Sequence, residues 1–241
     1  MKIGLIQTGA IGDIFIAAPI AQWFIDRGAE VYWPIDSSYT SFVEPALPGI
    51  RFLPVDRAAT GFRSYEYFVA NPLAQLLPLG CGNIYPLYSA LGNRSEGLVN
   101  PQYAASLKFD EYKYAIVGVP FQEKWRLNIK RDTEREKRLV DTLDLNHTAY
   151  VLRSEFAGCG THFPIHIPDH VIEGRKLVDV SSITENPLDW LGAIERADAL
   201  FLVEGLFSNL VDQLKVGRNR HVKLRSSVAS TPVLSSGWVF L

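Results

Sequence analysis

The sequence predicts an α/β protein made of two doubly wound domains, over residues 1–125 and 126–241. Three observations support this fold class. Short apolar runs alternate with helical segments in both halves of the chain, as βαβ units require. The run Ala199–Val203 is apolar throughout, which is typical of a buried strand in a parallel sheet. A turn containing two glycines separates the first apolar run from the first helix, at residues 7–13.

The first 36 residues form the clearest βαβ unit. A short apolar strand is expected over 2–7, where Ile and Leu predominate. From Ile14 to Ile25, apolar side chains recur every three to four residues, which indicates a helix. Arg27-Gly28 ends this helix, and a second strand is expected over 30–35.

The turn of this unit carries the chemistry that the sequence suggests. Gly9 and Gly12 are expected to let the backbone turn sharply and approach a ligand closely. Asp13 follows directly and stands where the helix begins. An aspartate at this place is either a capping residue or a functional carboxylate, and the turn by itself does not decide between the two roles.

The rest of the first domain continues the alternation of strands and helices. We expect strands over 50–55 and 83–88, and helices over 65–77 and 109–117. A hinge is expected over 119–131.

The second domain repeats the same pattern in a shorter length. A charged helix that Asp132 can cap opens it, and a loop rich in Gly and His spans 153–170. The expected strands are 148–152, 176–180, 199–203 and 221–224, and the expected helices are 132–143, 187–196 and 206–214.

Composition places the chain among ordinary globular proteins, with 47% hydrophobic and 21% charged residues. Its net charge of −2 gives no overall attraction to nucleic acid or anionic lipid. Cys81 and Cys159 match neither a disulfide framework nor a metal site, which favours a reduced, cytoplasmic setting. No uninterrupted apolar run reaches the roughly 18 residues of a membrane span, so no stable membrane insertion is expected. His162, His166 and His170 lack convincing zinc spacing.

The run Gly9-Ala10-Ile11-Gly12-Asp13, after an N-terminal strand and before an apolar helix, resembles the opening of the heptosyltransferase-type glycosyltransferases of family 9. The resemblance implies a GT-B architecture of two Rossmann-like domains, the second abbreviated here. It also implies inverting transfer of a sugar from a nucleotide-sugar donor to a hydroxyl, with no metal or other cofactor. Asp13 would be the general base, and Gly9, Ala10, Ile11 and Gly12 would form the acceptor-side loop.

A second match follows the strand 199–203. In the resembled family this strand ends in an aspartate that holds donor sugar hydroxyls, and a histidine lies on the first turn of the next helix. Glu204 and Asn209 stand at these two positions here. The amides of the helix start would bind the donor diphosphate, because a helix N-terminus offers unpaired N–H groups and partial positive charge. The remaining donor-binding residues implied are Gly205, Leu206, Phe207 and Ser208.

These departures from the family pattern leave the donor sugar open, because Glu204 is one methylene longer than aspartate and Asn209 does not titrate. Basic residues of the second half are expected to face the donor phosphates, and Arg153 is the strongest candidate because it ends a strand. The others are Lys215, Arg218, Arg220, Lys223 and Arg225.

The acceptor is either a cell-surface glycan or a hydroxymethylated base of phage-type DNA, and the near-neutral charge does not favour DNA.

Two other functions stay open. Asp36 lies about 23 residues beyond Asp13, where a dinucleotide-dependent oxidoreductase carries its ribose-binding acid. Against that function, the turn lacks the third glycine of the dinucleotide fingerprint. The third possibility is a non-catalytic nucleotide-binding protein on a degenerate GT-B scaffold.

Overall fold

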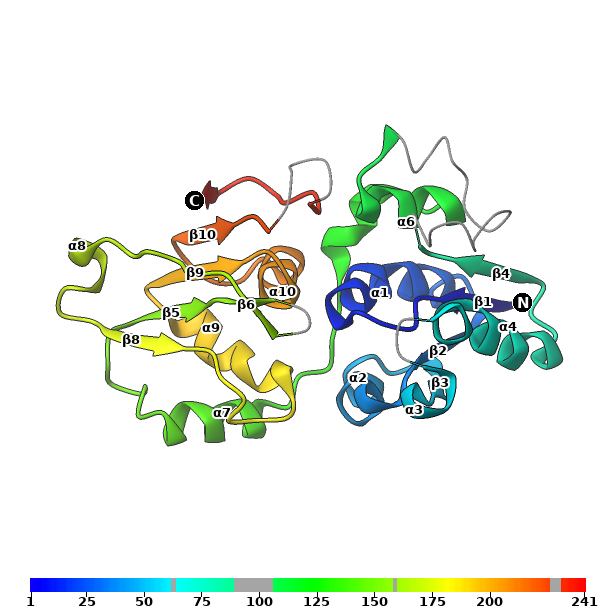
Figure 1. Cartoon of the computed structure of the whole chain (residues 1–241), viewed down its shortest axis with the longest axis horizontal. Helices are drawn as coiled ribbons and strands as arrows, with labels where there is room; N and C mark the ends of the chain where they lie inside the picture. Colours follow the sequence, from blue (N-terminus) through cyan, green and yellow to red (C-terminus); the bar gives the residue numbers. More distant parts are fainter. Residues whose placement is uncertain (62–63, 89–105, 158–159, 226–230) are drawn as a thin grey trace. The chain divides into compact units, whose positions relative to one another are not determined.

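The computed structural model describes residues 1–61, 64–88, 106–157, 160–225 and 231–241. The chain divides into two compact units, Met1–Lys130 and Arg131–Leu241 (Figure 1). The predicted division after residue 125 falls within η5 (Phe121–Arg126), a 3-10 helix that belongs to the first unit. The predicted hinge is thus packed, since the ring of Phe121 meets that of Tyr114 edge-on, at 5.4 Å between centroids.

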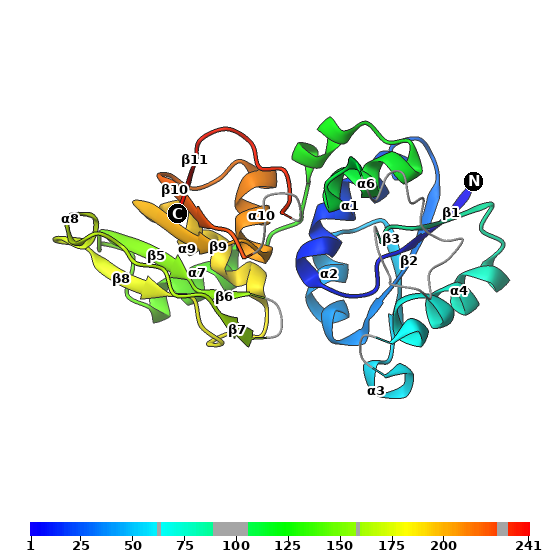
Figure 2. The same ribbon diagram turned by 45° about the horizontal axis from the view of Figure 1, so that its top comes forward.

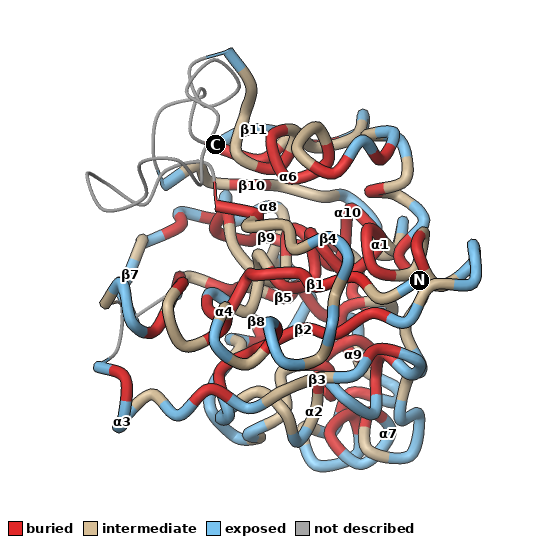
Figure 3. The backbone as a smooth tube through the Cα atoms, turned by 90° about the vertical axis from the view of Figure 1, so that its right-hand side faces the viewer, coloured by how far each residue is buried: buried red, intermediate tan, exposed pale blue. Residues whose placement is uncertain are grey.

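The first unit contains a parallel sheet of four strands in the order β3-β2-β1-β4. The strands are β1 (Lys2–Ile6), β2 (Glu30–Asp36), β3 (Ile50–Val55) and β4 (Asn83–Pro86). All four were expected from the sequence, although β4 ends two residues earlier than predicted. Figure 3 shows that buried residues are concentrated along the central strands, such as β1.

Helices cover both faces of this sheet. Tyr85 of β4 stacks on Phe24 of α1 (Ile11–Ile25), whereas the neighbouring residue Ile84 packs into a cluster with Leu76 of α4 (Asn71–Leu76). Because successive residues of a strand point to opposite faces, α1 and α4 lie on opposite sides of the sheet. α6 (Phe109–Val117) packs beside α1, to which the Tyr114 hydroxyl donates a hydrogen bond at the carbonyl of Ile16, 2.8 Å away.

Shorter helical segments complete the first unit. The helix expected over 65–77 is divided into a π-helical turn, α4 and a 3-10 turn, with Pro72 in the first turn of α4, where proline is tolerated. The short segments are η1 (Ser37–Tyr39), α2 (Thr40–Ala46), α3 (Arg57–Thr60), η2 (Glu66–Ala70) and η3 (Leu77–Leu79).

The second unit contains a parallel sheet of five strands in the order β11-β10-β9-β5-β8. These strands are β5 (Tyr150–Ser154), β8 (Lys176–Asp179), β9 (Ala199–Val203), β10 (Arg220–Lys223) and β11 (Trp238–Phe240). The sequence did not predict β11. It also missed an antiparallel hairpin, β6 (Phe156–Ala157) with β7 (Thr161–His162), in the segment expected to be a loop (Figure 2).

The helices of the second unit include the three predicted segments, together with α8 (Asp169–Ile172), which the sequence did not predict. They are α7 (Thr133–Thr142), α8, η7 (Pro187–Trp190), α9 (Leu191–Arg196) and α10 (Leu206–Leu214). Asp132 caps α7 as expected, since its side chain accepts a hydrogen bond of 3.0 Å from the backbone N–H of Arg135. None of the helices in the described part of the chain has the length and apolar character needed to cross a bilayer.

Both sheets have a point where the strand order reverses direction. In the first unit this point lies between β1 and β4, and in the second unit between β5 and β9. Open parallel sheets bind ligands outside the carboxyl ends of the strands at such switch points. The residues that follow these four strands are therefore the first place to look for a site.

Candidate functional site

The turn after β1 is built differently from the expectation. Ala10 makes the sharp bend in the left-handed region, at φ 60°, whereas Gly9 and Gly12 lie outside that region. Gly9 is needed instead for close packing, because a Cβ there would lie 2.7 Å from the hydroxyl oxygen of Tyr67. Gly12 lies inside α1, which begins at Ile11.

Asp13 lies in the first turn of α1, and the N-cap position belongs to Ala10. Asp13 is therefore not the capping residue that one interpretation of the sequence suggested. Its side chain is 29% exposed, and Oδ2 lies 4.0 Å from the Nζ atom of Lys113 on α6. The carboxylate thus stands at the switch point of the first sheet, close to a cation that the sequence did not reveal.

Lys113 is almost entirely buried, with 2% of its side chain exposed. Its ammonium donates hydrogen bonds to Oε1 of Gln7 at 2.5 Å and to the carbonyl of Leu87 at 3.0 Å. These two acceptors follow β1 and β4, so Lys113 joins the carboxyl ends of both strands. Burial lowers the pKa of Lys113, and the negative charges of Asp13 and Asp110 oppose that effect.

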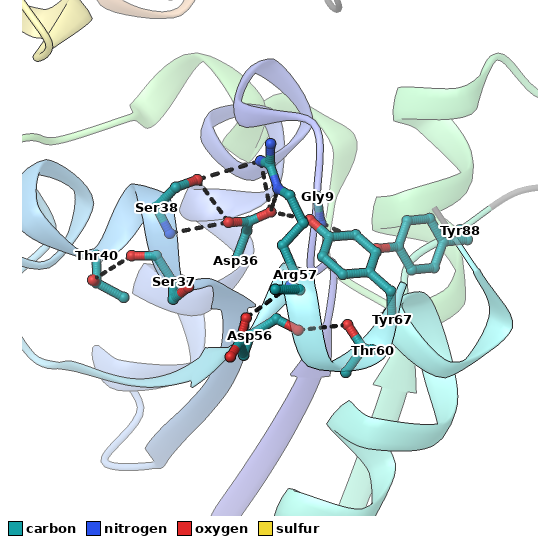
Figure 4. A network of polar contacts seen from close by, with 11 residues as sticks. Gly9, Asp36, Ser37, Ser38, Thr40, Asp56, Arg57, Thr60, Tyr67 and Tyr88 are labelled. Atoms are coloured by element: carbon teal, nitrogen blue, oxygen red, sulfur yellow. Dashed lines mark hydrogen bonds and ion pairs between the residues drawn. The ribbon is translucent and has the colours of Figure 1, made fainter. Parts of the chain in front are cut away.

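Asp36, the candidate ribose-binding acid, is completely buried at the end of β2. Oδ1 accepts hydrogen bonds from the N–H and the hydroxyl of Ser38, at 3.0 and 2.6 Å. Oδ2 accepts from the hydroxyl of Tyr67 at 2.6 Å and from Nε of Arg57 at 2.8 Å (Figure 4). Four donors of the same unit therefore occupy both oxygens, which disfavours a role for Asp36 in holding a ribose.

The same contacts make Asp36 a source of acid sensitivity. Burial by itself would raise the pKa of Asp36, but the hydrogen bonds from Ser38, Tyr67 and Arg57 outweigh it and hold the pKa below its ordinary value of 3.8. A depressed carboxyl pKa stabilises the fold above the unfolded-state pKa, and this contribution is lost as pH falls through the folded-state value. We therefore expect Asp36→Asn to destabilise the protein at pH 7, by an amount that shrinks below about pH 4. Denaturant unfolding over a pH series measures this difference, and parallel curves for the two proteins would contradict it.

The second unit has a cavity of about 670 Å³ at the carboxyl end of β5, one of the two strands that flank its switch point. It opens beyond the carboxyl ends of β5 and β8, and Phe207 at the start of α10 forms part of its wall. Its lining residues are Arg153, Ser154, Glu155, Phe156, Gly160, His162, Asp179, Val180, Ser181, Ser182 and Phe207. Two predicted donor-binding residues, Arg153 and Phe207, thus line one cavity although they are far apart in the sequence.

Charged side chains along this cavity hold one another in place. Nε of Arg153 donates to Oδ1 of Asp179 at 2.7 Å, and another of its nitrogens lies 3.4 Å from Glu155. This contact with Asp179 raises the pKa of Arg153 above its usual value. Glu155 also accepts from the N–H of Ile165 at 2.6 Å and lies 3.1 Å from Nε2 of His162. Arg153 therefore reaches the cavity as a cation that two carboxylates already orient.

Side chains of α10 form hydrogen bonds with the backbone of the turn before it. The hydroxyl of Ser208 accepts a 2.9 Å hydrogen bond from the N–H of Gly205, and Nδ2 of Asn209 donates to the carbonyl of Gly205 at 2.7 Å. Ser208 and Asn209 thus shape the turn. The first-turn N–H groups of Leu206, Phe207 and Ser208 have no acceptor within the helix, and such groups favour an anion.

Glu204 makes a contact that the sequence did not predict. Its side chain is 2% exposed, and its two oxygens accept hydrogen bonds from Arg225 at 2.8 and 2.9 Å. A sugar hydroxyl at Glu204 would have to compete with this bidentate guanidinium. The pair joins the ends of β9 and β10, and it brings Arg225 to the same sheet edge as α10.

Two of the histidines considered as zinc ligands, His162 and His170, lie in different cavities. His162 pairs with Glu155 in the large cavity, whereas His170 lies on α8 and lines a different cavity. Among the residues that the structure describes, no group of three His, Cys, Asp or Glu side chains has an arrangement that could hold a metal ion. Cys159 lies outside the described residues.

Sequence comparisons find no matching family model and no matching curated protein. Solved structures do match. E. coli ADP-heptose LPS heptosyltransferase II has a TM-score of 0.63 and 13% identity, covering 100% of this chain and 90% of that one. A glycosyltransferase family 9 protein from Veillonella parvula DSM 2008 has a TM-score of 0.61 and 10% identity, covering 100% and 86%. E. coli heptosyltransferase WaaC with ADP has a TM-score of 0.55 and 10% identity, covering 100% of this chain and 92% of that one. The chain therefore shares the mixed α/β fold with parallel sheets of these structures.

Proposed function

We propose that the protein is a glycosyltransferase of the GT-B type, which moves a sugar from a nucleotide-sugar donor to a hydroxyl acceptor, without a metal ion and with inversion. The observation that carries this proposal is the cavity at the carboxyl ends of β5 and β8 in the second unit, with Phe207 from the first turn of α10 in its wall. In this proposal the first unit is the acceptor-side Rossmann-like domain, and the second unit is the donor-side one. The fold shared with heptosyltransferases and the cytoplasmic setting expected from the cysteines agree with it.

The second unit offers what a nucleoside diphosphate needs. A volume of about 670 Å³ suits a nucleotide, since small-molecule sites measure about 300–1,000 Å³. Phe207, Phe156 and His162 supply flat rings on which a base can stack. The amides of Leu206 to Ser208, with Arg153 and Arg225 at the same sheet edge, would hold the diphosphate.

The first unit offers a proton acceptor. The acceptor hydroxyl would attack the anomeric carbon, forming a new C–O bond while the bond from that carbon to the diphosphate oxygen breaks. Asp13 would take the proton of the hydroxyl, and the nucleoside diphosphate would leave with the bonding electron pair. A direct displacement of this kind inverts the configuration at the anomeric carbon. The similar structure of E. coli heptosyltransferase WaaC holds ADP, so an ADP-sugar is the first donor to try.

Nucleotide binding tests the proposal before any acceptor is known. We expect ADP, UDP, GDP or CMP to bind, as measured by calorimetry, and Phe207→Ala to weaken the binding by about 5- to 150-fold, because a base stacked on an aromatic ring gains about 1–3 kcal/mol. Leu77→Ala is the matched control, since Leu77 is an exposed apolar residue of the other unit. The donor site would be refuted if no nucleotide bound, or if Phe207→Ala bound as tightly as the parent.

Three further measurements separate the competing functions. A non-catalytic binding protein would bind nucleotide but never release nucleoside diphosphate from a nucleotide-sugar. An oxidoreductase would bind NAD more tightly than any nucleoside diphosphate. The hydrogen bonds that Asp36 already accepts from Arg57 and Tyr67 argue against NAD binding there. A DNA acceptor, in place of a cell-surface glycan, would give retention on duplex DNA that weakens steeply with salt.

A further inference from the structure

Lys113 is a buried cation of the first unit that has no role in the transfer step proposed above. Nζ of Lys113 lies 4.0 Å from Oδ2 of Asp13, too far for a hydrogen bond and close enough for strong attraction. The hydrogen bonds of this ammonium go to neutral acceptors, the side chain of Gln7 and the carbonyl of Leu87. A buried ammonium is costly unless it is paired, so its place beside Asp13 calls for an explanation.

Titratable groups face Lys113 from three directions. Asp13 faces it from α1, and Asp110 lies one turn earlier on α6. Asp110 itself is paired with Lys124 of η5, at 2.7 Å. Tyr88, which follows β4, turns its ring toward Lys113 at 5.8 Å, and burial raises the pKa of this phenol, which keeps it neutral. Because Lys124 balances Asp110, Asp13 is the carboxylate whose charge Lys113 balances.

We infer that Lys113 is a positioning residue for Asp13: its buried ammonium keeps the Asp13 carboxylate ionised and holds it at the end of β1, ready to accept a proton. The role in transfer rests on the proposed function, whereas the coupling of the two side chains does not. An opposite charge within about 4–6 Å shifts the pKa of a carboxyl group by about 1–3 units. Without the ammonium, Asp13 would take up a proton at a higher pH and would be lost as a base there.

Lys113 also limits the reaction on the alkaline side. Its burial lowers its pKa from 10.5, so it loses its charge at a lower pH than an exposed lysine does. Above that pH, Asp13 would still be ionised but would lose the attraction that holds it at the end of β1. The rate of transfer should therefore fall at alkaline pH in the parent protein.

NMR titration of the Asp13 carboxyl group tests the coupling directly. We expect its midpoint to rise by about 1–3 pH units in Lys113→Met and to stay unchanged in Lys130→Met. Lys130 is the matched control, an exposed lysine of the same unit. An unmoved midpoint in a folded Lys113→Met protein would overturn the inference.

A reciprocal measurement covers the case in which Lys113→Met does not fold. Asp13 is partly exposed, so Asp13→Asn should fold, and coupling between two sites is mutual. The Nζ titration of Lys113 should then move to lower pH in Asp13→Asn, by as many units as the first experiment predicts. A titration that does not move would equally overturn the inference.

Activity supplies the final readout. If transfer is found, the acid limb of its pH–rate profile should move upward in Lys113→Met, which a merely structural loss of activity would not produce. If no transfer is found, the proposed function fails, but the two titrations still decide whether Lys113 controls Asp13. The two failures are thus distinguishable.

Discussion

An Asp13→Asn protein is expected to transfer sugar about 10²–10⁴-fold more slowly than the parent, which is the usual contribution of a general base. The amide matches the carboxylate in shape but cannot accept a proton from the attacking hydroxyl. The variant should still fold, because Asp13 is partly exposed and Ala10, not Asp13, occupies the N-cap of α1, but it should lose some stability because the buried ammonium of Lys113 loses its counter-charge. Release of nucleoside diphosphate measures the rate, and thermal unfolding checks the fold.

Asp26→Asn is the matched control for this experiment. Asp26 lies at the C-cap of the same helix and is exposed, so the control makes the same chemical change away from the switch point. Full activity in Asp13→Asn would refute the role of the carboxylate as base. Equal losses in the two variants would show that the effect comes from the helix and not from the proton acceptor.

Elements with strong local signals were predicted well. β9 and α10 have the predicted bounds, because a continuous apolar run stops at Glu204 and Gly205 begins a new helix. Asp132 was likewise recognised as a cap from its place before a charged helix. In both cases the deciding residues are neighbours in the sequence, so their spacing carries the information.

Elements that depend on distant partners were missed. β11 has three residues, and it forms only by pairing with β10. In this pairing Trp238 lies opposite Arg220, which is 18 positions earlier in the sequence. The hairpin β6–β7 is shorter still, with two residues in each strand. The left-handed turn at Ala10 was misjudged for another reason. Positive φ is unfavourable for alanine and costs glycine nothing, so the sequence points to the flanking glycines as the residues that make the bend.

The same reasoning explains which site residues were found. Asp13 and Phe207 lie in the first turns of the helices that follow β1 and β9, and the rule for open sheets points to such positions. Lys113 lies on a helix, and its partner Gln7 lies 106 residues away. No pattern of this kind among its neighbours in the sequence therefore marks Lys113 as a site residue. One signal was present, since Lys113 shares a helix face with Asp110 and Val117, at spacings of three and four. A lysine on the buried face of a predicted helix is a reason to search for a carboxylate partner.

The ion pair of Lys124 and Asp110 gives the largest expected effect on stability. Both side chains are completely buried, and Nζ lies 2.7 Å from Oδ2. Lys124→Met removes the cation and deprives the buried Asp110 carboxylate of this partner, and losing one partner of a buried pair costs about 3–5 kcal/mol. Urea unfolding at pH 7 would measure this loss in the free energy of unfolding.

Arg126→Met is the matched control, because Arg126 lies in the same short helix and its pair with Glu123 is largely exposed on the arginine side, at 75%. This variant should change the free energy of unfolding by at most about 1 kcal/mol. The double variant Lys124→Met with Asp110→Asn should recover most of the loss, because no buried charge is left unpaired. A double variant as unstable as Lys124→Met would show that the ammonium of Lys124 stabilises the unit through its other contacts, and not by balancing the charge of Asp110.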